Sequence, residues 1–344
     1  MNTNIWAVSE FDLEEILQNT LEECYVLRNS QITILGGTGF IGTWITSFLL
    51  YASKSLNLNT EIIVPTRNPE FAKGKLKVNS QYQIRFIQLD LNNKVDVNYD
   101  ESRFFIIGAT PSNRFTGAMD DERVSAITRN AINSVINFSI KKGIVPNVLN
   151  LSSGAVYGVQ KEEFQAERDV EIERLSLTNY GLAKLKAEIE LRMSDSRNEI
   201  KCSNPRLFAF FGPHLPLDAH FAIGNFLNDC LKGNSLIVNG NPKTVRSYLY
   251  PTDLVTWIIK LLVKPTLQNL NFGSDIPITM EYLGGLLTKK FKSPAIKFTN
   301  PLSPSNIYVP EIQNTKRVLG VTQKVSLDQG IDRWVEWVKA QDKI

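Results

Sequence analysis

Short apolar runs alternate with longer amphipathic stretches over the first two thirds of the chain. The apolar runs fall at 32–35, 61–64, 84–88, 104–107 and 147–151, and each has the length of a buried strand. One predicted helix follows the first strand and ends at about residue 51, and another covers residues 121–142. A further strand is predicted at 200–208. Buried strands joined by helical crossovers predict an α/β fold, a doubly wound parallel sheet of the Rossmann type.

The pattern changes on either side of this alternation. Residues 10–28 carry apolar positions at three- and four-residue spacing and predict one amphipathic helix, so residues 1–29 form a helical extension on the outside of the core. We expect residues 30–211 to form a dinucleotide-binding domain, because a glycine-rich turn at residues 36–42 follows the first predicted strand. Beyond residue 212 proline, glycine and asparagine become denser, with predicted helices at 254–263 and 326–339. We expect residues 212–344 to form mainly a smaller, mixed substrate-binding lobe, with segments that return to the main sheet.

Composition narrows the classes of function. Of 344 residues 43% are apolar and 21% charged, as in ordinary globular domains, and the net charge of +3 is spread without the basic block of a nucleic-acid-binding protein. No apolar stretch has the length of a membrane span, and no secretory signal opens the chain. Cys24, Cys202 and Cys230 lack metal-ligand spacing, and there are two histidines. We expect a cytoplasmic protein with reduced thiols, no metal site, and neither nucleic acid nor membrane as partner.

A glycine-rich turn follows the first predicted strand and opens a helix. It reads Gly36-Gly37-Thr38-Gly39-Phe40-Ile41-Gly42. Glycines allow a tight turn and a close approach of the backbone to a pyrophosphate, and the helix N-terminus offers unpaired N–H groups to the phosphates. The alternative is a glycine-rich turn without a ligand, which the strand–turn–helix context disfavours.

The end of the second strand bears on which dinucleotide binds. An NAD-selective site usually has a carboxylate there for the ribose 2′-hydroxyl. This chain has none, and Arg67 stands where its planar guanidinium could hold a 2′-phosphate. We therefore favour NADP(H) over NAD(H). The alternative is that Arg67 lies on the surface or stacks on the adenine.

Three polar residues predict the chemistry. Tyr180 and Lys184 are four residues apart and share one face of a helix, so the ammonium can approach the phenol and should lower its pKa. Tyr180 would then exchange a proton with the oxygen of an alcohol or ketone. Ser153 comes just after the strand that ends at Leu151, where its hydroxyl can stabilise charge on that oxygen.

At these residues the chain resembles the extended short-chain dehydrogenase/reductase family, the branch of nucleotide-sugar epimerases, dehydratases and reductases. The resemblance covers about residues 30–340. It rests on the glycine turn and on the segments Leu89-Asp90-Leu91, Gly108-Ala109-Thr110, Leu151-Ser-Ser153-Gly-Ala-Val-Tyr157-Gly158, Tyr180-Gly-Leu-Ala-Lys184, Pro205-Arg206-Leu207-Phe208, Phe211-Gly212-Pro213 and Arg246-Ser-Tyr-Leu-Tyr250-Pro-Thr-Asp253.

The resemblance implies a role for each matching position. Ser153, Tyr180 and Lys184 would be catalytic, and a nucleotide-diphosphate sugar would be the substrate. Arg246 would bind its diphosphate, and Asn225 and Tyr250 would line the same lobe. The cofactor would contact Gly36, Thr38, Gly39, Phe40, Ile41, Gly42, Arg67, Asp90, Leu91, Gly108, Ala109, Thr110, Tyr180 and Lys184. Because the family often pairs through the two long helices beside the sheet, a homodimer is a candidate assembly.

Two departures from the family pattern limit the reaction. The 4,6-dehydratases show Thr-Asp-Glu-Val-Tyr-Gly where this chain has Ser153-Gly154-Ala155-Val156-Tyr157-Gly158, without the acid pair, so dehydration is disfavoured. Ala209 replaces an asparagine that is frequent after Arg-x-Phe. We therefore predict an NAD(P)-dependent oxidoreductase that reduces a 4-keto sugar. The alternatives are an epimerase that retains its cofactor and a non-catalytic dinucleotide sensor, against which Tyr180 and Lys184 both argue.

Overall fold

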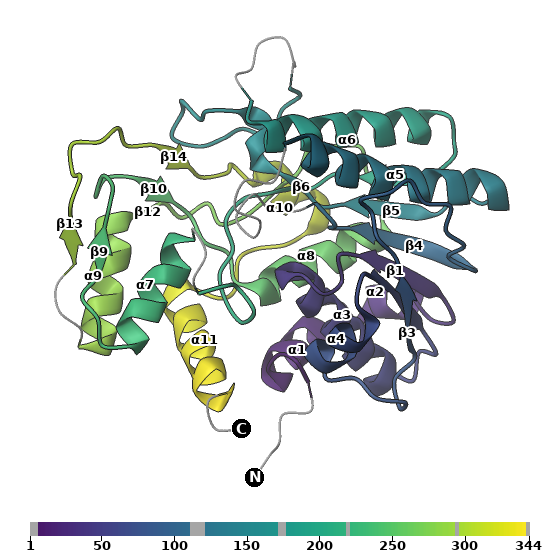
Figure 1. Cartoon of the computed structure of the whole chain (residues 1–344), viewed down its shortest axis with the longest axis horizontal. Helices are drawn as coiled ribbons and strands as arrows, with labels where there is room; N and C mark the ends of the chain where they lie inside the picture. Colours follow the sequence, from purple (N-terminus) through teal and green to yellow (C-terminus); the bar gives the residue numbers. More distant parts are fainter. Residues whose placement is uncertain (1–5, 111–120, 171–176, 218–220, 293–295, 342–344) are drawn as a thin grey trace.

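The computed structural model describes residues 6–110, 121–170, 177–217, 221–292 and 296–341. A large domain holds the main sheet between two layers of helices, and a smaller lobe of short strands and helices lies beside it (Figure 1).

The main sheet has six parallel strands in the order β3-β2-β1-β4-β5-β7. Their bounds are β1 Gln31–Leu35, β2 Glu61–Thr66, β3 Ile84–Gln88, β4 Ser102–Ile107, β5 Asn147–Asn150 and β7 Lys201–Ser203. This confirms the predicted doubly wound α/β fold. The strand order reverses between β1 and β4, and in open α/β sheets such a switch point opens a crevice at the carboxyl ends of the strands.

Helices cover both faces of this sheet (Figure 1). The helices α5 (Asp121–Lys142) and α6 (Asn179–Ser196) pack together on one face, and α3 (Phe40–Ser55), α4 (Pro69–Leu76) and α8 (Pro251–Val263) cover the other. Successive residues of a strand point to opposite faces of the sheet, so they contribute to two hydrophobic cores, one on each face. Ile106 packs with Trp44 and Phe48 of α3, whereas Phe105 packs with Val135 of α5.

The N-terminal extension is helical, but it is two helices and not the single one predicted over 10–28. They are α1 (Glu10–Gln18) and α2 (Leu21–Val26). Asn19 donates from its side chain to Glu15 O at 2.6 Å, and Thr20 donates to Ile16 O at 2.8 Å. Such side-chain bonds to the preceding turn compete with helix continuation. The first helix packs against α3 and α8.

The single strand predicted over 200–208 is also two strands, and they belong to different sheets. β7 closes the main sheet, while β8 (Arg206–Leu207) lies between β6 (Ser152–Ser153) and β11 (Asn271–Phe272) in a three-stranded sheet. Pro205 stands between them, and a proline cannot donate to a strand ladder. The break turns the chain from the main sheet toward the region of Ser153.

Segments beyond residue 212 contribute to both parts of the molecule. α8 packs against β5, and β11 pairs with β8, so these two segments return to the large domain without joining its six-stranded sheet. The other described elements form the smaller lobe and the C-terminal helices (Figure 1): α7 Ala222–Leu231, β9 Ile237–Val238, β10 Val245–Arg246, β12 Ile278–Thr279, α9 Met280–Phe291, β13 Lys297–Phe298, β14 Ile307–Tyr308, α10 Gln313–Leu319 and α11 Leu327–Gln341.

Candidate active site

One cavity of about 1240 Å³ runs from the carboxyl ends of the main strands into the smaller lobe. The predicted cofactor residues all line it, as do Ser153 and Arg246: Gly36, Thr38, Gly39, Phe40, Ile41, Gly42, Arg67, Asp90, Leu91, Gly108, Ala109, Thr110, Tyr180 and Lys184. Residues from 36 to 184 thus share one wall, because the strands of a parallel sheet all end at the same edge, and the smaller lobe adds Arg246 from β10.

The glycine turn forms the first section of the cavity. Gly39 donates its N–H to Gly36 O at 3.0 Å, and α3 begins directly afterwards at Phe40. A Cβ atom on Gly42 would lie 2.1 Å from Gly36 O, so no other residue fits there without moving the turn. The tight turn leaves the first N–H groups of a sixteen-residue helix at the cavity, where they can bind an anion.

Two basic side chains, those of Arg67 and Lys75, lie near this section. Arg67 follows β2 and is exposed, and its guanidinium has no hydrogen-bond or ion-pair partner among the described residues. Lys75 of α4 donates to Thr38 O at 2.6 Å, which brings a second cation to the glycine turn. The carboxylate of Asp90, which accepts from Asn92 N at 3.1 Å, lines the same section. Sequence reasoning missed Lys75, since nothing in its spacing connects α4 with the turn.

Ser153, Tyr180 and Lys184 come together beyond the end of β5. Ser153 Oγ accepts from Ala155 N at 3.2 Å, which fixes the hydroxyl at the start of a short 3₁₀ turn. Tyr180 lies in the first turn of α6, half-buried at the cavity wall. One turn later Lys184 is buried, and its Nζ donates to Leu151 O at 2.6 Å. The three predicted residues therefore form one cluster.

The electrostatics of this cluster differ from the expectation. The Lys184 ammonium points to Leu151 O and lies 5.9 Å from the ring centre of Tyr180, and it does not lower the pKa of that phenol. Burial instead raises the pKa of Tyr180, and the hydrogen bond with Ser153 opposes the rise. Burial also lowers the pKa of Lys184 to about 7, against the attraction of Glu188. At neutral pH Tyr180 is thus a protonated phenol and a proton donor.

A buried ion pair supports the cluster from behind. Glu188, one turn after Lys184, accepts from Arg206 Nη2 at 2.8 Å and from Arg206 Nε at 3.1 Å. Ser152 Oγ donates to the same carboxylate. Together with Ser152, the pair joins α6 to β6, the strand that contains Ser153, and to β8, which pairs with β6, and sequence reasoning did not find it. No local spacing links Glu188 to Arg206, which comes 18 residues later in the chain.

The lobe presents Arg246 and two phenols to the cavity. Arg246 donates to Val245 O at 2.7 Å and stands opposite Tyr308 in the register of β10 and β14. Tyr248, two residues further along, lines the same wall. Neither phenol was predicted, although the spacing from Arg246 to Tyr248 is that of one face of a strand.

Two predicted substrate contacts lie elsewhere. Tyr250 is fully buried, and its hydroxyl donates to Asp12 Oδ2 at 3.0 Å. The extended chain turns into α8 right after it, so the alternation that carries Arg246 and Tyr248 to the cavity ends there. Asn225 is half-buried in α7 but does not line the cavity, which the start of that helix reaches through Phe221, Ala222 and Ile223.

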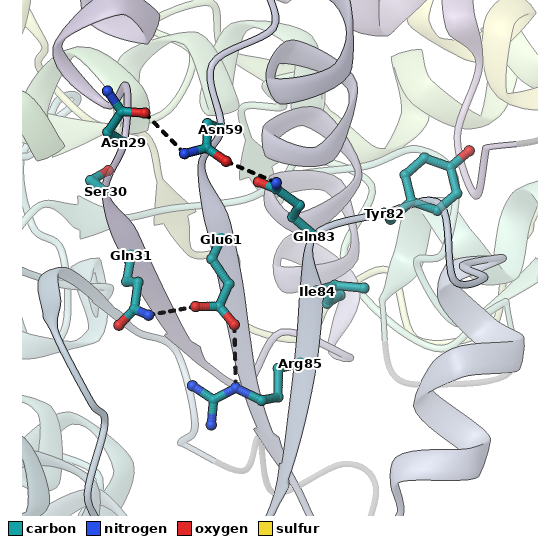
Figure 2. A pocket seen from close by; sticks show the side chains of 9 residues that line it. All are labelled: Asn29, Ser30, Gln31, Asn59, Glu61, Tyr82, Gln83, Ile84 and Arg85. Carbon is teal, nitrogen blue, oxygen red and sulfur yellow. Dashed lines mark hydrogen bonds and ion pairs between the residues drawn. The ribbon is translucent and has the colours of Figure 1, made fainter.

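A separate polar hollow of about 550 Å³ lies at the opposite edge of the sheet, where β1, β2 and β3 begin (Figure 2). Its side chains already bond to one another: Asn59 donates to Asn29 at 3.0 Å, Gln83 to Asn59 at 2.9 Å, and Arg85 to Glu61 at 3.3 Å (Figure 2). None of the predicted site residues lies there.

The described residues contain no group of three or more His, Cys, Asp or Glu side chains placed to hold a metal ion. Across the same ranges, no helix is both long and apolar enough to cross a membrane.

The chain is similar to proteins of known structure and activity over most of its length. UDP-glucuronic acid decarboxylase 6 of Arabidopsis thaliana is 24% identical over 308 residues, which are 88% of this chain and 87% of that protein. The epimerase Mth375 of Methanothermobacter thermautotrophicus superposes with a TM-score of 0.78 at 17% identity, covering 95% of this chain and 97% of that one. MoeE5, solved with UDP-glucuronic acid and NAD, gives a TM-score of 0.71 at 20% identity over 91% and 100%. These structures share its fold.

A family model described as the NAD dependent epimerase/dehydratase family matches residues 32–273. The match begins in β1, spans the glycine turn and the Ser153–Tyr180–Lys184 cluster, and ends after β11. The chain belongs to the NAD dependent epimerase/dehydratase family.

Proposed function

We propose that this protein is an NAD(P)-dependent oxidoreductase that acts on a nucleotide-diphosphate sugar. The observation that carries the proposal is the single cavity of about 1240 Å³ that joins the glycine turn, the Ser153–Tyr180–Lys184 cluster and Arg246. Pockets for one small ligand commonly measure about 300–1,000 Å³. The larger space leaves room for a dinucleotide and for a second ligand whose diphosphate meets the Arg246 guanidinium.

The residues of the glycine turn fit a dinucleotide. A Cβ on Gly42 would fill the turn, and the start of α3 faces the cavity with unpaired N–H groups. A bound nicotinamide cofactor supplies or accepts the hydride. The chain itself binds the cofactor pyrophosphate at the turn, binds the diphosphate of the substrate at Arg246 and moves a proton at the Tyr180 oxygen.

The finer proposal is reduction of a 4-keto group. The raised pKa of Tyr180 keeps the phenol protonated at neutral pH, which suits proton donation to a carbonyl oxygen. Among the described residues that line the cavity, Asp90 is the only carboxylate, and it belongs to the glycine-turn section. Gly154 and Ala155 leave the cluster without the acid pair that a dehydration would use. A reaction confined to hydride and proton transfer at one carbon fits these groups best.

The proposed cofactor is NADPH, because Arg67 lines the cavity directly after β2 and no carboxylate ends that strand. Arg67→Asp should weaken NADPH binding at least 10-fold while NADH binding changes little, measured by fluorescence titration of the reduced nicotinamide. Lys73→Ala, an exposed α4 lysine paired with Glu70, is the matched control and should leave the ratio unchanged. Equal losses for both cofactors in Arg67→Asp would contradict NADPH selectivity.

The activity is tested with purified protein, NADPH and a panel of 4-keto-6-deoxy sugar nucleotides. Loss of the reduced nicotinamide absorbance, absent in Tyr180→Phe, is expected. Loss of absorbance with no member of the panel would count against reduction. The similarity to an epimerase favours one alternative, an epimerase that retains its cofactor. It would be indicated by oxidised cofactor that stays bound through purification and by an epimer formed from UDP-sugars without net redox change. Release of CO₂ from UDP-glucuronic acid would instead indicate a decarboxylase.

We also propose a homodimer formed through α5 and α6. Ile140 of α5 and Ile189 and Met193 of α6 are exposed by 56%, 39% and 55%, which gives these paired helices an apolar outer surface. Analytical ultracentrifugation at micromolar concentration should give about twice the chain mass of 38.8 kDa. A monomer there would remove the proposal.

A further inference from the structure

The peptide unit between Thr38 and Gly39 is held by a hydrogen bond at each end. Its N–H, which belongs to Gly39, donates to Gly36 O at 3.0 Å within the turn. Its carbonyl oxygen, which belongs to Thr38, accepts from Lys75 Nζ at 2.6 Å. The N–H and the C=O of a planar trans peptide point in opposite directions, so these two bonds fix the orientation of the whole unit.

This peptide unit determines how the start of α3 faces the cavity. Gly39 is the N-cap residue of α3, and Phe40 and Ile41 supply its first N–H groups. Glycine has wide backbone freedom, and Gly36 uses it with a φ of +88°. A turn so rich in glycine has little stiffness of its own. The bond from Lys75 comes from a different element, and it restricts this freedom.

Helix α4 holds Lys75 from outside the turn. The Asn68 side chain caps the helix by accepting from a backbone N–H of the first turn at 3.0 Å, and the helix packs against α3 and β3. Ala72 and Leu76 are buried, which fixes the face that the helix turns to the core. Lys75 itself is half-buried, so its ammonium reaches the turn from one defined direction.

We propose that Lys75 is a positioning residue of the cofactor site: through its bond to Thr38 O it holds the glycine turn in the conformation that presents the α3 N-terminus to the dinucleotide pyrophosphate. The inference rests on the proposed dinucleotide-binding function of the turn. Thr38 lines the cavity whereas Lys75 does not, so Lys75 acts through the backbone of the turn. A site that is ordered before binding loses less conformational freedom when the ligand arrives, which raises the affinity.

The first measurement follows the turn without any ligand. Amide hydrogen exchange is measured by mass spectrometry on peptides that cover residues 36–42, in protein freed of nucleotide. Lys75→Met keeps a long apolar stem and removes the ammonium. Exchange in these peptides should become about 10-fold faster, because a hydrogen bond from a charged group contributes that much or more to an equilibrium. Lys73→Met, at an exposed lysine of the same helix paired with Glu70, should leave it unchanged.

The second measurement titrates the same three proteins with NADPH and with NADH, using the fluorescence of the reduced nicotinamide. Lys75→Met should weaken the binding of both by about 10-fold, because both dinucleotides carry the pyrophosphate that the turn binds. Arg67→Asp should weaken NADPH alone, so the two basic residues have different signatures. Lys73→Met should leave both affinities unchanged.

Four results would overturn the proposal. Weaker binding with unchanged exchange would mean that the ammonium attracts the phosphates directly, and a loss for NADPH alone would mean that it binds the 2′-phosphate. Faster exchange with unchanged affinities would show that the bond to Thr38 O does not serve the cofactor. Equal losses in Lys73→Met and Lys75→Met would show a general effect of positive charge.

Failure of the proposed function would look different. A wild-type protein that binds neither dinucleotide would contradict that function and this role with it, whereas the exchange rates show independently whether Lys75 orders the turn. Circular dichroism melts of each variant verify that the fold is retained. We expect Lys75→Met to fold, because burial lowers the pKa of Lys75 and an uncharged side chain suits this position.

Discussion

Asp12, in the first helix, accepts a hydrogen bond from Arg333, in the last one, at 2.8 Å between Oδ1 and Nη1. The carboxylate side chain is 1% exposed, and it also accepts from Tyr250 at 3.0 Å and Thr252 at 3.3 Å. Two segments 321 residues apart are thus joined at a buried charge, beside the start of α8.

Removing this carboxylate should destabilise the whole fold. Asp12→Ala leaves the hydroxyl groups of Tyr250 and Thr252 without their acceptor in a buried site and leaves Arg333 with Glu15 alone, and we expect the free energy of unfolding to fall by about 2–5 kcal/mol in urea denaturation. Glu15→Ala is the matched control, because Glu15 binds the same guanidinium at 2.6 Å but from a more exposed position. Glu15→Ala should lower the free energy of unfolding by about 1 kcal/mol or less. Equal losses for both variants would contradict the importance of burial here.

The ion pair of Glu188 and Arg206 should show strong coupling. Both side chains are nearly inaccessible, at 2% and 3% exposure, so removing one leaves the other charge buried and unpaired. Glu188→Leu should lower the free energy of unfolding by about 3–5 kcal/mol, whereas Glu188→Leu combined with Arg206→Met should lose less than the sum of the two single variants. Strict additivity in urea denaturation would show that the pair does not act as a unit.

Burial of Lys184 should lower the free energy of unfolding at neutral pH. Burial lowers its pKa from 10.5 to about 7, so the folded protein prefers the neutral amine and folding releases a proton between these values. The free energy of unfolding therefore rises as the pH increases from 7 toward 10. As the pH falls to 7 and below, the buried amine must be protonated and this gain in stability is lost. In Lys184→Met this slope should vanish.

At pH 7, Lys184→Met should be more stable than the wild type by about 1–3 kcal/mol and inactive. Exposed Lys186, two residues along α6, provides the comparison: Lys186→Met should keep the wild-type slope. Urea denaturation at several pH values measures both variants. A destabilised Lys184→Met protein with an unchanged slope would argue that the ammonium is well solvated or paired in the folded state.

The glycine turn should tolerate no side chain at Gly42. The Cβ of Gly42→Ala would lie 2.1 Å from Gly36 O, and we expect a loss of about 1–3 kcal/mol in stability together with weaker dinucleotide binding. Gly74→Ala in α4 is the opposite case, because no atom lies within 4 Å of its Cβ position. Alanine favours the helix there by about 0.5–1 kcal/mol. Melting curves and titration with reduced cofactor compare the two, and similar effects would refute the steric argument.

The sequence by itself determined the strand and helix alternation and most of the cofactor-side cavity. Hydrophobic periodicity predicted β3 and α5 with the bounds that the structure has, and the glycine turn, Ser153, Tyr180 and Lys184 lie where local motifs put them. These features depend on residues close together in the chain. The glycine turn follows a strand and precedes a helix, and residues four apart lie on the same face of a helix.

Tertiary structure decided the rest, because it depends on residues far apart in the chain. Asn19 and Thr20 end a helix that periodicity alone would continue, and Pro205 sends one apolar run into two sheets. Tyr250 points inward because its hydroxyl donates to the buried carboxylate of Asp12 in the N-terminal extension. The ammonium of Lys184 donates to Leu151 O, although its spacing along the helix predicts a contact with the hydroxyl of Tyr180. Tyr308 reaches Gly154 only through the packing of the lobe, and no local pattern carries that information.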